Sequence, residues 1–214
     1  MSTITIERPA SATTPARRLP GIAVLVMGAL AGAALGIAAR AWMRVITEHP
    51  EFTWNGTMFI VVGFTLFGTA QAGAVVGRRS RHRAVTTTAR VIACVAMMPL
   101  FGAAGSIMLP TVIGGGLALA RNDWPRPLRC LLTLVALAPV AFVAHEIVDG
   151  FGWSWRTPAG LAGFLCIYAT LVVAIRPAFA PVPGRRMSRI AKVALAIVVV
   201  AVLLAGVALA GSGA

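Results

Sequence analysis

The residues that could carry chemistry are few, and most of them fall at the ends of long apolar segments. Arginine, histidine and carboxylate side chains flank two such segments, and a glutamine lies inside a third. The members of this candidate polar cluster are Arg40, Arg44, Gln71, His145, Glu146 and Asp149. Polar and charged groups at membrane depth are costly and usually functional. These residues are therefore the first candidates for a binding or transport site.

The spacing of the charged members places them on common helix faces. Arg40 and Arg44 are four residues apart, as are His145 and Asp149, so each pair projects from one side of its helix. We expect both pairs at the outer ends of their helices. Ion pairs from the two arginines to Glu146 and Asp149 would offset the cost of partial burial. The first interpretation is a structural ion-pair network.

Two other interpretations stay open. In an outward-facing vestibule, Glu146 would take up a proton or an ion and Gln71 would line the route inward. A metal site could draw on the histidines and acids of two segments. Its ligands would come from Glu48, His49, Glu51, His145, Glu146 and Asp149. Because H-E-x-x-D is not the H-E-x-x-H pair of zinc proteases, we assign no metal residue.

Motifs of common membrane enzymes and cofactor proteins are missing from the sequence. There is no Walker A motif, no C-x-x-C-H haem motif and no G-x-S-x-G serine motif. The cysteines Cys94, Cys130 and Cys166 are isolated, so neither a metal nor a disulfide framework is indicated. We therefore assign no catalytic or cofactor-binding residue and expect no enzyme.

The composition indicates the environment that must position these residues. The 214-residue chain is 58% hydrophobic and 12% charged, with a mean hydropathy of +0.87. Soluble domains are about 45–50% apolar and about 25% charged. Lipid would solvate the surplus apolar surface, which predicts an all-α, polytopic transmembrane helix bundle. We expect residues 1–19 to be a disordered cytoplasmic tail and residues 20–214 a single transmembrane domain.

The predicted spans are 21–43, 56–77, 129–148, 158–176 and 190–211. The stretch 87–120 is harder to assign because Arg90 is its only charge. As one straight helix it would rise about 50 Å, well beyond a hydrocarbon core of about 30 Å. It must therefore bend or cross twice, in two short segments near 87–104 and 106–120. Its glycines and Pro110 provide places for a break.

The distribution of basic residues favours two crossings. With seven spans and the N-terminus inside, only Arg40, Arg44 and Arg156 of the 19 basic residues lie outside, which leaves 16 inside. Six spans, the alternative, place 9 inside and 10 outside. The positive-inside rule therefore favours seven spans and a C-terminus outside. The basic loops would face anionic lipids at the cytoplasmic surface.

No nucleic-acid-binding motif accompanies the net charge of +13, and we exclude nucleic acid as a partner.

Small residues indicate where helices approach one another closely. Gly28, Gly32 and Gly36 recur every four residues in the first span, and Gly73 and Gly77 do so in the second. Such positions bring two helix backbones into van der Waals contact. The facing helix could belong to the same chain, to a second copy or to a membrane-protein partner.

One segment supports a resemblance. The sequence ARAWMRVITEHPEFTWNGTMFIVVGFTLFG, residues 39–68, resembles part of uncharacterised multi-pass membrane proteins from high-GC bacteria. The likeness covers a short part of the chain and implies a bacterial plasma membrane, with no assigned chemistry. Two functions remain expected. The first is a non-catalytic structural or accessory subunit of a membrane complex; the alternative is a small transporter, channel or permease-like protein that uses the polar cluster.

Overall fold

The computed structural model describes residues 19–47, 53–100 and 109–181, and this part of the chain folds into a bundle of helices. The helices are α1 (Gly21–Val45), α2 (Trp54–Gly77), α3 (Arg83–Val95), α5 (Leu109–Ala120), α6 (Arg126–Phe151), α7 (Arg156–Ala174) and α8 (Arg176–Phe179). Five segments are long and apolar enough to cross a membrane: α1, α2, Arg83–Leu100, α6 and Arg156–Phe179. The predicted helical class is confirmed. The predicted span 190–211 and residues 1–18 lie outside the described residues.

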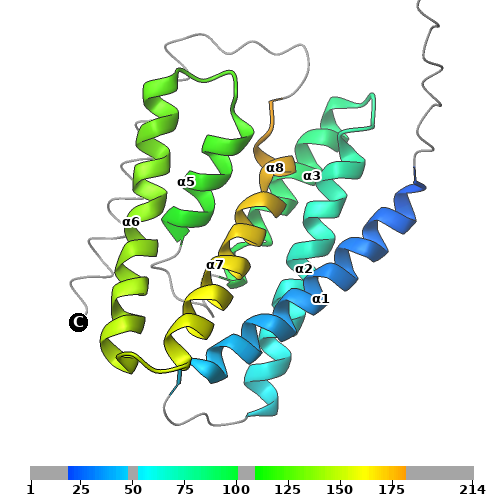
Figure 1. The fold of residues 1–214 in the computed structure, drawn as a ribbon. Helices are drawn as coiled ribbons and strands as arrows, with labels where there is room; N and C mark the ends of the chain where they lie inside the picture. The colour runs from blue at the N-terminus through cyan, green and yellow to red at the C-terminus, as the bar shows by residue number, and fades with distance from the viewer. Residues whose placement is uncertain (1–18, 48–52, 101–108, 182–214) are drawn as a thin grey trace, which may run out of the picture.

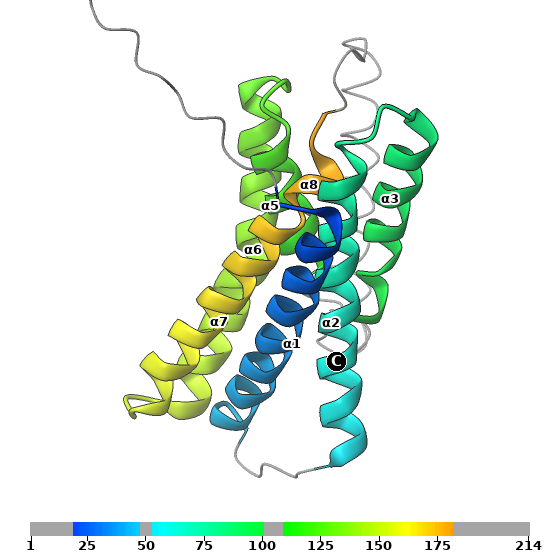
Figure 2. The same cartoon turned by 90° about the vertical axis from the view of Figure 1, so that its right-hand side faces the viewer.

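The helices pack side by side, with two of them central to the contacts (Figures 1 and 2). Helix α2 packs against both α1 and α3, and α7 contacts α1, α5 and α6. The short helix α8 packs against α2, α3 and α5. The α2–α3 turn, the α5–α6 loop and α8 lie at one end of the bundle, and the α6–α7 turn lies at the other (Figure 1).

The long apolar stretch 87–120 enters the bundle and returns to the end from which it came. Its first helical part stops at a turn, where the Met97 amide donates to the Cys94 carbonyl at 3.3 Å. Helix α5 then runs antiparallel to α3 (Figure 1). With 12 residues it rises only about 18 Å, too short to cross a bilayer alone. Short or irregular segments are tolerated at membrane depth only against protein, and α5 packs against α6, α7 and α8.

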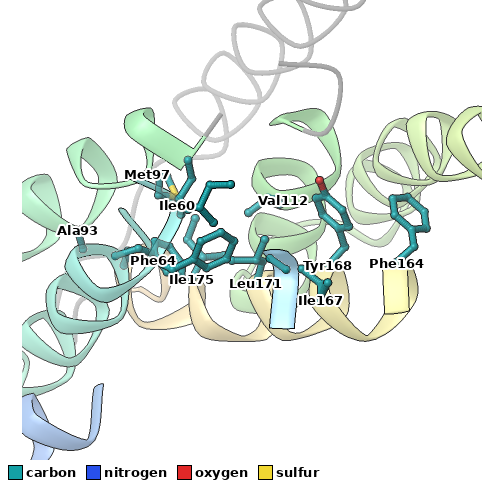
Figure 3. Packing of buried hydrophobic residues seen from close by; sticks show 14 of the residues in the cluster. Ile60, Phe64, Ala93, Met97, Val112, Phe164, Ile167, Tyr168, Leu171 and Ile175 are labelled. Atoms are coloured by element: carbon teal, nitrogen blue, oxygen red, sulfur yellow. The ribbon is translucent and has the colours of Figure 1, made fainter. Parts of the chain in front are cut away.

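The core lies where α2, α5 and α7 meet. Figure 3 shows Phe64 of α2 and Val112 of α5 beside Tyr168 and Leu171 of α7, and all four side chains are buried. The outside of the bundle is also apolar, and Ile22 is 77% exposed. Large exposed apolar side chains recur on α1, α2, α6 and α7. Because water would solvate such a surface poorly, the helices have the exterior expected of a membrane protein.

The glycine stripe of the first helix is occupied by α2 of the same chain. A Cβ built on Gly32 would collide with the Phe64 carbonyl oxygen, and one on Gly36 would lie 3.0 Å from the Val61 Cα. A Cβ on Gly28 would collide with the Ala72 Cβ. From the other side, a Cβ on Gly68 would meet the Gly28 carbonyl oxygen. Sequence analysis did not single out Gly68, although it completes this backbone contact.

The two glycines predicted in the second span differ in their surroundings. A Cβ on Gly77 would lie 2.7 Å from the Ala89 Cβ, so Gly77 permits the close approach of α2 and α3. At Gly73 the nearest atom would be the Leu25 Cδ2, at 3.9 Å. That is an ordinary van der Waals distance, so close approach does not require a glycine at Gly73.

A leucine at Gly32 should destabilise the bundle because its side chain would force α1 and α2 apart. The matched control is Gly63→Leu on α2, where a Cβ would meet nothing within 4 Å. We expect Gly32→Leu to lower the free energy of unfolding in detergent by about 1–3 kcal/mol, as overpacked contacts do. Gly63→Leu should have little effect. Equal effects of the two substitutions would exclude the close contact.

Candidate functional site

The charged members of the predicted polar cluster lie at one end of the bundle but on different sides of α7. Arg40 and Arg44 belong to the last turns of α1. The other charged members, His145, Glu146 and Asp149, belong to the last turns of α6. Helix α7 contacts both α1 and α6. The residue of this part of α6 that faces α7 is Ile147, whose Cγ2 would lie 3.3 Å from a Cβ on Gly160. The neighbouring His145, Glu146 and Asp149 are exposed.

The structure pairs some cluster members locally. His145 Nδ1 lies 3.4 Å from Asp149 Oδ1, and the two side chains are 67% and 68% exposed. Arg40 Nε donates to the Thr57 hydroxyl at 3.2 Å, which links α1 to α2. In the three described ranges, no ion pair joins Arg40 or Arg44 to Glu146 or Asp149. An exposed pair such as His145–Asp149 contributes little to stability.

Gln71 lies apart from the outer cluster and forms a hydrogen bond where the α3 segment breaks. Its side chain is buried, and its Nε2 donates to the Ala93 carbonyl at 3.0 Å. In a regular helix that carbonyl would accept from the Met97 amide, but Met97 donates to Cys94 instead. Gln71 therefore replaces a missing donor. Its Oε1 has no hydrogen-bond partner in the described part of the chain.

Trp42 joins α1 to α7, a role that sequence analysis did not predict. Its indole N–H donates to the Gly160 carbonyl at 2.7 Å, and its ring stacks on Phe164 at 5.8 Å. A Cβ on Gly163 would lie 2.5 Å from the Trp42 Cδ1. The spacing of Gly160 and Gly163 on one helix face was the available signal.

Other polar side chains of the bundle also donate to backbone carbonyls. The Thr111 hydroxyl of α5 donates to the Ala136 carbonyl of α6 at 2.8 Å. Ala136 is next to Val135, whose carbonyl loses its helical donor because Pro139 has no N–H. Arg129 Nε donates to the Ala118 carbonyl at 3.1 Å, in the last turn of α5. A carbonyl in the last turn of a helix has no helical donor, so Arg129 supplies one to Ala118. Thr111 instead adds a bond between α5 and α6 that lipid could not offer.

The enclosed cavity in the core is small and apolar. It has a volume of about 20 Å³, and its lining includes Trp42, Phe64, Met97, Tyr168 and Leu171. A water molecule fits in such a volume but needs two to four polar partners to remain there. The lining offers almost none, so this cavity forms no polar path between the outer cluster and Gln71.

A second hollow, at the opposite end from the polar cluster, is open and basic. This depression of about 380 Å³ is lined by Val75, Arg78, Ala120, Val173, Arg176, Pro177 and Ala180. Arg90 lies close enough to Arg78 and to Arg121 for each of them to repel its positive charge. Burial lowers the pKa of Arg121, and the nearby carboxylate of Asp123 opposes that shift. Sequence analysis assigned arginines to this end but did not predict the depression.

The metal interpretation draws partly on Glu48, His49 and Glu51, which lie outside the described residues. Among the residues that the structure does describe, no three histidine, cysteine or acidic side chains are grouped to hold a metal ion. No known protein family, curated protein or solved structure matches the chain. The geometry of the helices is therefore the basis for a functional proposal.

Proposed function

We propose that this chain is a multi-pass protein of a bacterial plasma membrane that serves as a non-catalytic structural or accessory subunit of a membrane complex. One observation carries the proposal: polar side chains inside the bundle donate to backbone carbonyls of neighbouring helices. Gln71 and Thr111 are both engaged in this way. Polar groups that complete the fold are expected of a scaffold, whereas a conduit needs polar groups along an open path.

The transporter alternative would join the outer acids to Gln71. Glu146 and Asp149 are exposed on the outside of α6, and Gln71 contacts α3. The enclosed cavity is lined almost entirely by apolar side chains. These positions favour the structural role over the conduit.

The packing of α2 on the glycines of α1 limits which surface of the bundle a partner could contact. Because α2 covers Gly28, Gly32 and Gly36, a second copy could use that stripe only by displacing α2. A partner subunit would instead pack on the apolar outer surface of the bundle. Helices such as α1 and α6 carry large exposed side chains there, among them Leu30 and Leu134, each 66% exposed.

We further propose seven spans with the N-terminus inside and the C-terminus outside. Nine of the twelve described arginines belong to the end that holds the α2–α3 turn and α8: Arg78, Arg79, Arg81, Arg83, Arg90, Arg121, Arg126, Arg129 and Arg176. The other end holds the remaining three, Arg40, Arg44 and Arg156. The positive-inside rule would place the nine-arginine end in the cytoplasm. Anionic lipids would then face this end.

Cysteine labelling of intact cells should separate seven spans from six. In a variant without native cysteines, we would label Ser80→Cys, Asn122→Cys and Trp153→Cys with a membrane-impermeant maleimide. Seven spans predict that only Trp153→Cys reacts from outside, because the loops of Ser80 and Asn122 share one end. With six spans, Asn122→Cys would react from outside. Permeabilised cells supply the control, since all three cysteines should react there.

Mild-detergent purification followed by mass spectrometry tests the proposed role. We expect a membrane protein to copurify in a fixed ratio and to dissociate when an exposed apolar contact is changed. A set of single substitutions to tryptophan on α1 and α6, for example Leu30→Trp and Leu134→Trp, would locate that contact. Ile22→Trp, near the end of α1, is a matched control. A chain that purifies alone, together with ion or solute flux abolished by Glu146→Gln, would contradict the scaffold.

A further inference from the structure

The open depression at the basic end has the two-part lining that an anionic amphiphile requires. Val75 and Arg78 of the α2 end lie three residues apart, and Val173 and Arg176 of the α7 end repeat that spacing. In both cases the valine lies in the last turn of its helix and the arginine follows just beyond the end of that helix. Apolar side chains therefore line the deeper part of the depression, and guanidinium groups lie toward the end of the bundle.

Backbone carbonyls of α8 orient two guanidinium groups near the depression. Arg78 Nη1 donates to the Pro177 carbonyl at 3.4 Å, and Arg90 Nε donates to the Ala178 carbonyl at 2.6 Å. Each guanidinium carries five N–H donors, so most donors of both groups stay available. Arg176 makes no hydrogen bond through its side chain within the described ranges. The arginines therefore retain donors for an external acceptor.

None of the residues that line the depression is acidic. Of the six acidic residues in the sequence, Asp123, Glu146 and Asp149 are described. Asp123 acts on Arg121, and the other two lie on the last turns of α6 at the opposite end. Arg78 and Arg121 each repel the positive charge of Arg90. A bound anion would relieve this repulsion, and arginine suits phosphate oxygens because its planar fork binds two of them at once.

From this arrangement we propose a binding site for the phosphate of an anionic phospholipid headgroup. The phosphate contacts Arg78 and Arg176, and the glycerol and first methylenes lie against Val75 and Val173. The site rests on the membrane embedding proposed above, but not on which end faces the cytoplasm. A free phosphate ester shares the charge but lacks the apolar part that the valines contact.

Native mass spectrometry of the full-length protein in detergent tests the site, with phosphatidylglycerol and phosphatidylcholine as probes. We expect one tightly bound phosphatidylglycerol and weak binding of phosphatidylcholine. The double variant Arg78→Gln/Arg176→Gln should bind phosphatidylglycerol about thirtyfold more weakly, since each basic contact contributes about a factor of five. The matched control Arg83→Gln/Arg126→Gln removes the same charge from exposed positions outside the depression and should bind as wild type does.

A second variant separates loss of the site from loss of the fold. Val173 is 54% exposed, so Val173→Trp should fold normally while its ring fills the depression, and we expect it to abolish the bound lipid. Equal weakening in both double variants would overturn the site in favour of diffuse surface charge. If glycerol 3-phosphate at equal concentration displaced the bound phosphatidylglycerol, the site would be one for a soluble phosphate ester and not for a lipid. If only the lipid site is wrong, the protein still resists carbonate extraction from membranes and still copurifies with any partner subunit. If the proposed function is wrong, one of these two results is lost.

Discussion

Backbone carbonyls without a donor are the constraint on which this structure depends. In hydrocarbon no water replaces a missing hydrogen bond, and each unsatisfied group costs several kcal/mol. A bundle of straight helices would avoid the problem, but this chain contains a turn at Met97, a proline at 139 and a half-length helix α5. Each of these creates carbonyls that need a donor from elsewhere. The positions of Gln71 and Arg129 follow from that need. Thr111 donates to the Ala136 carbonyl, beside the Val135 carbonyl that Pro139 leaves without its helical donor.

The close packing of helices follows from the same requirement. Short side chains such as Thr111 can reach a carbonyl of another helix only if the two backbones lie near each other. Glycines at Gly114 and Gly116 allow this on α5, where a Cβ on Gly114 would lie 3.1 Å from the Leu132 carbonyl oxygen. A Cβ on Gly116 would collide with Ile175. The glycine triplet 114–116, which the sequence offered as a place for a break, lies within α5 and allows α5 to pack closely against α6, α7 and α8.

The sequence predicted the helices well because apolar length is a local property. Four described spans lie within a few residues of their predicted bounds, and the stretch 87–120 breaks as its length required. The side-chain contacts were harder to predict because they depend on which helices are neighbours. Arg40 was expected near Glu146, yet it contacts Thr57 on α2. The Trp42 indole, which the sequence analysis did not single out, donates to the Gly160 carbonyl of α7. Neither contact follows from spacing within one helix.

The most direct test of this account is the stability of Thr111→Val. Valine keeps the shape of the buried threonine and removes the hydroxyl that donates to Ala136. The control is Thr133→Val, because the exposed Thr133 hydroxyl donates only within its own helix, to Arg129. We would compare free energies of unfolding in mixed micelles. A loss of about 0.6–1.7 kcal/mol for Thr111→Val, with little change in the control, is the range expected for an interhelical bond. Equal stability of the two variants would contradict the claim that interior polar side chains stabilise the bundle by donating to the backbone of neighbouring helices.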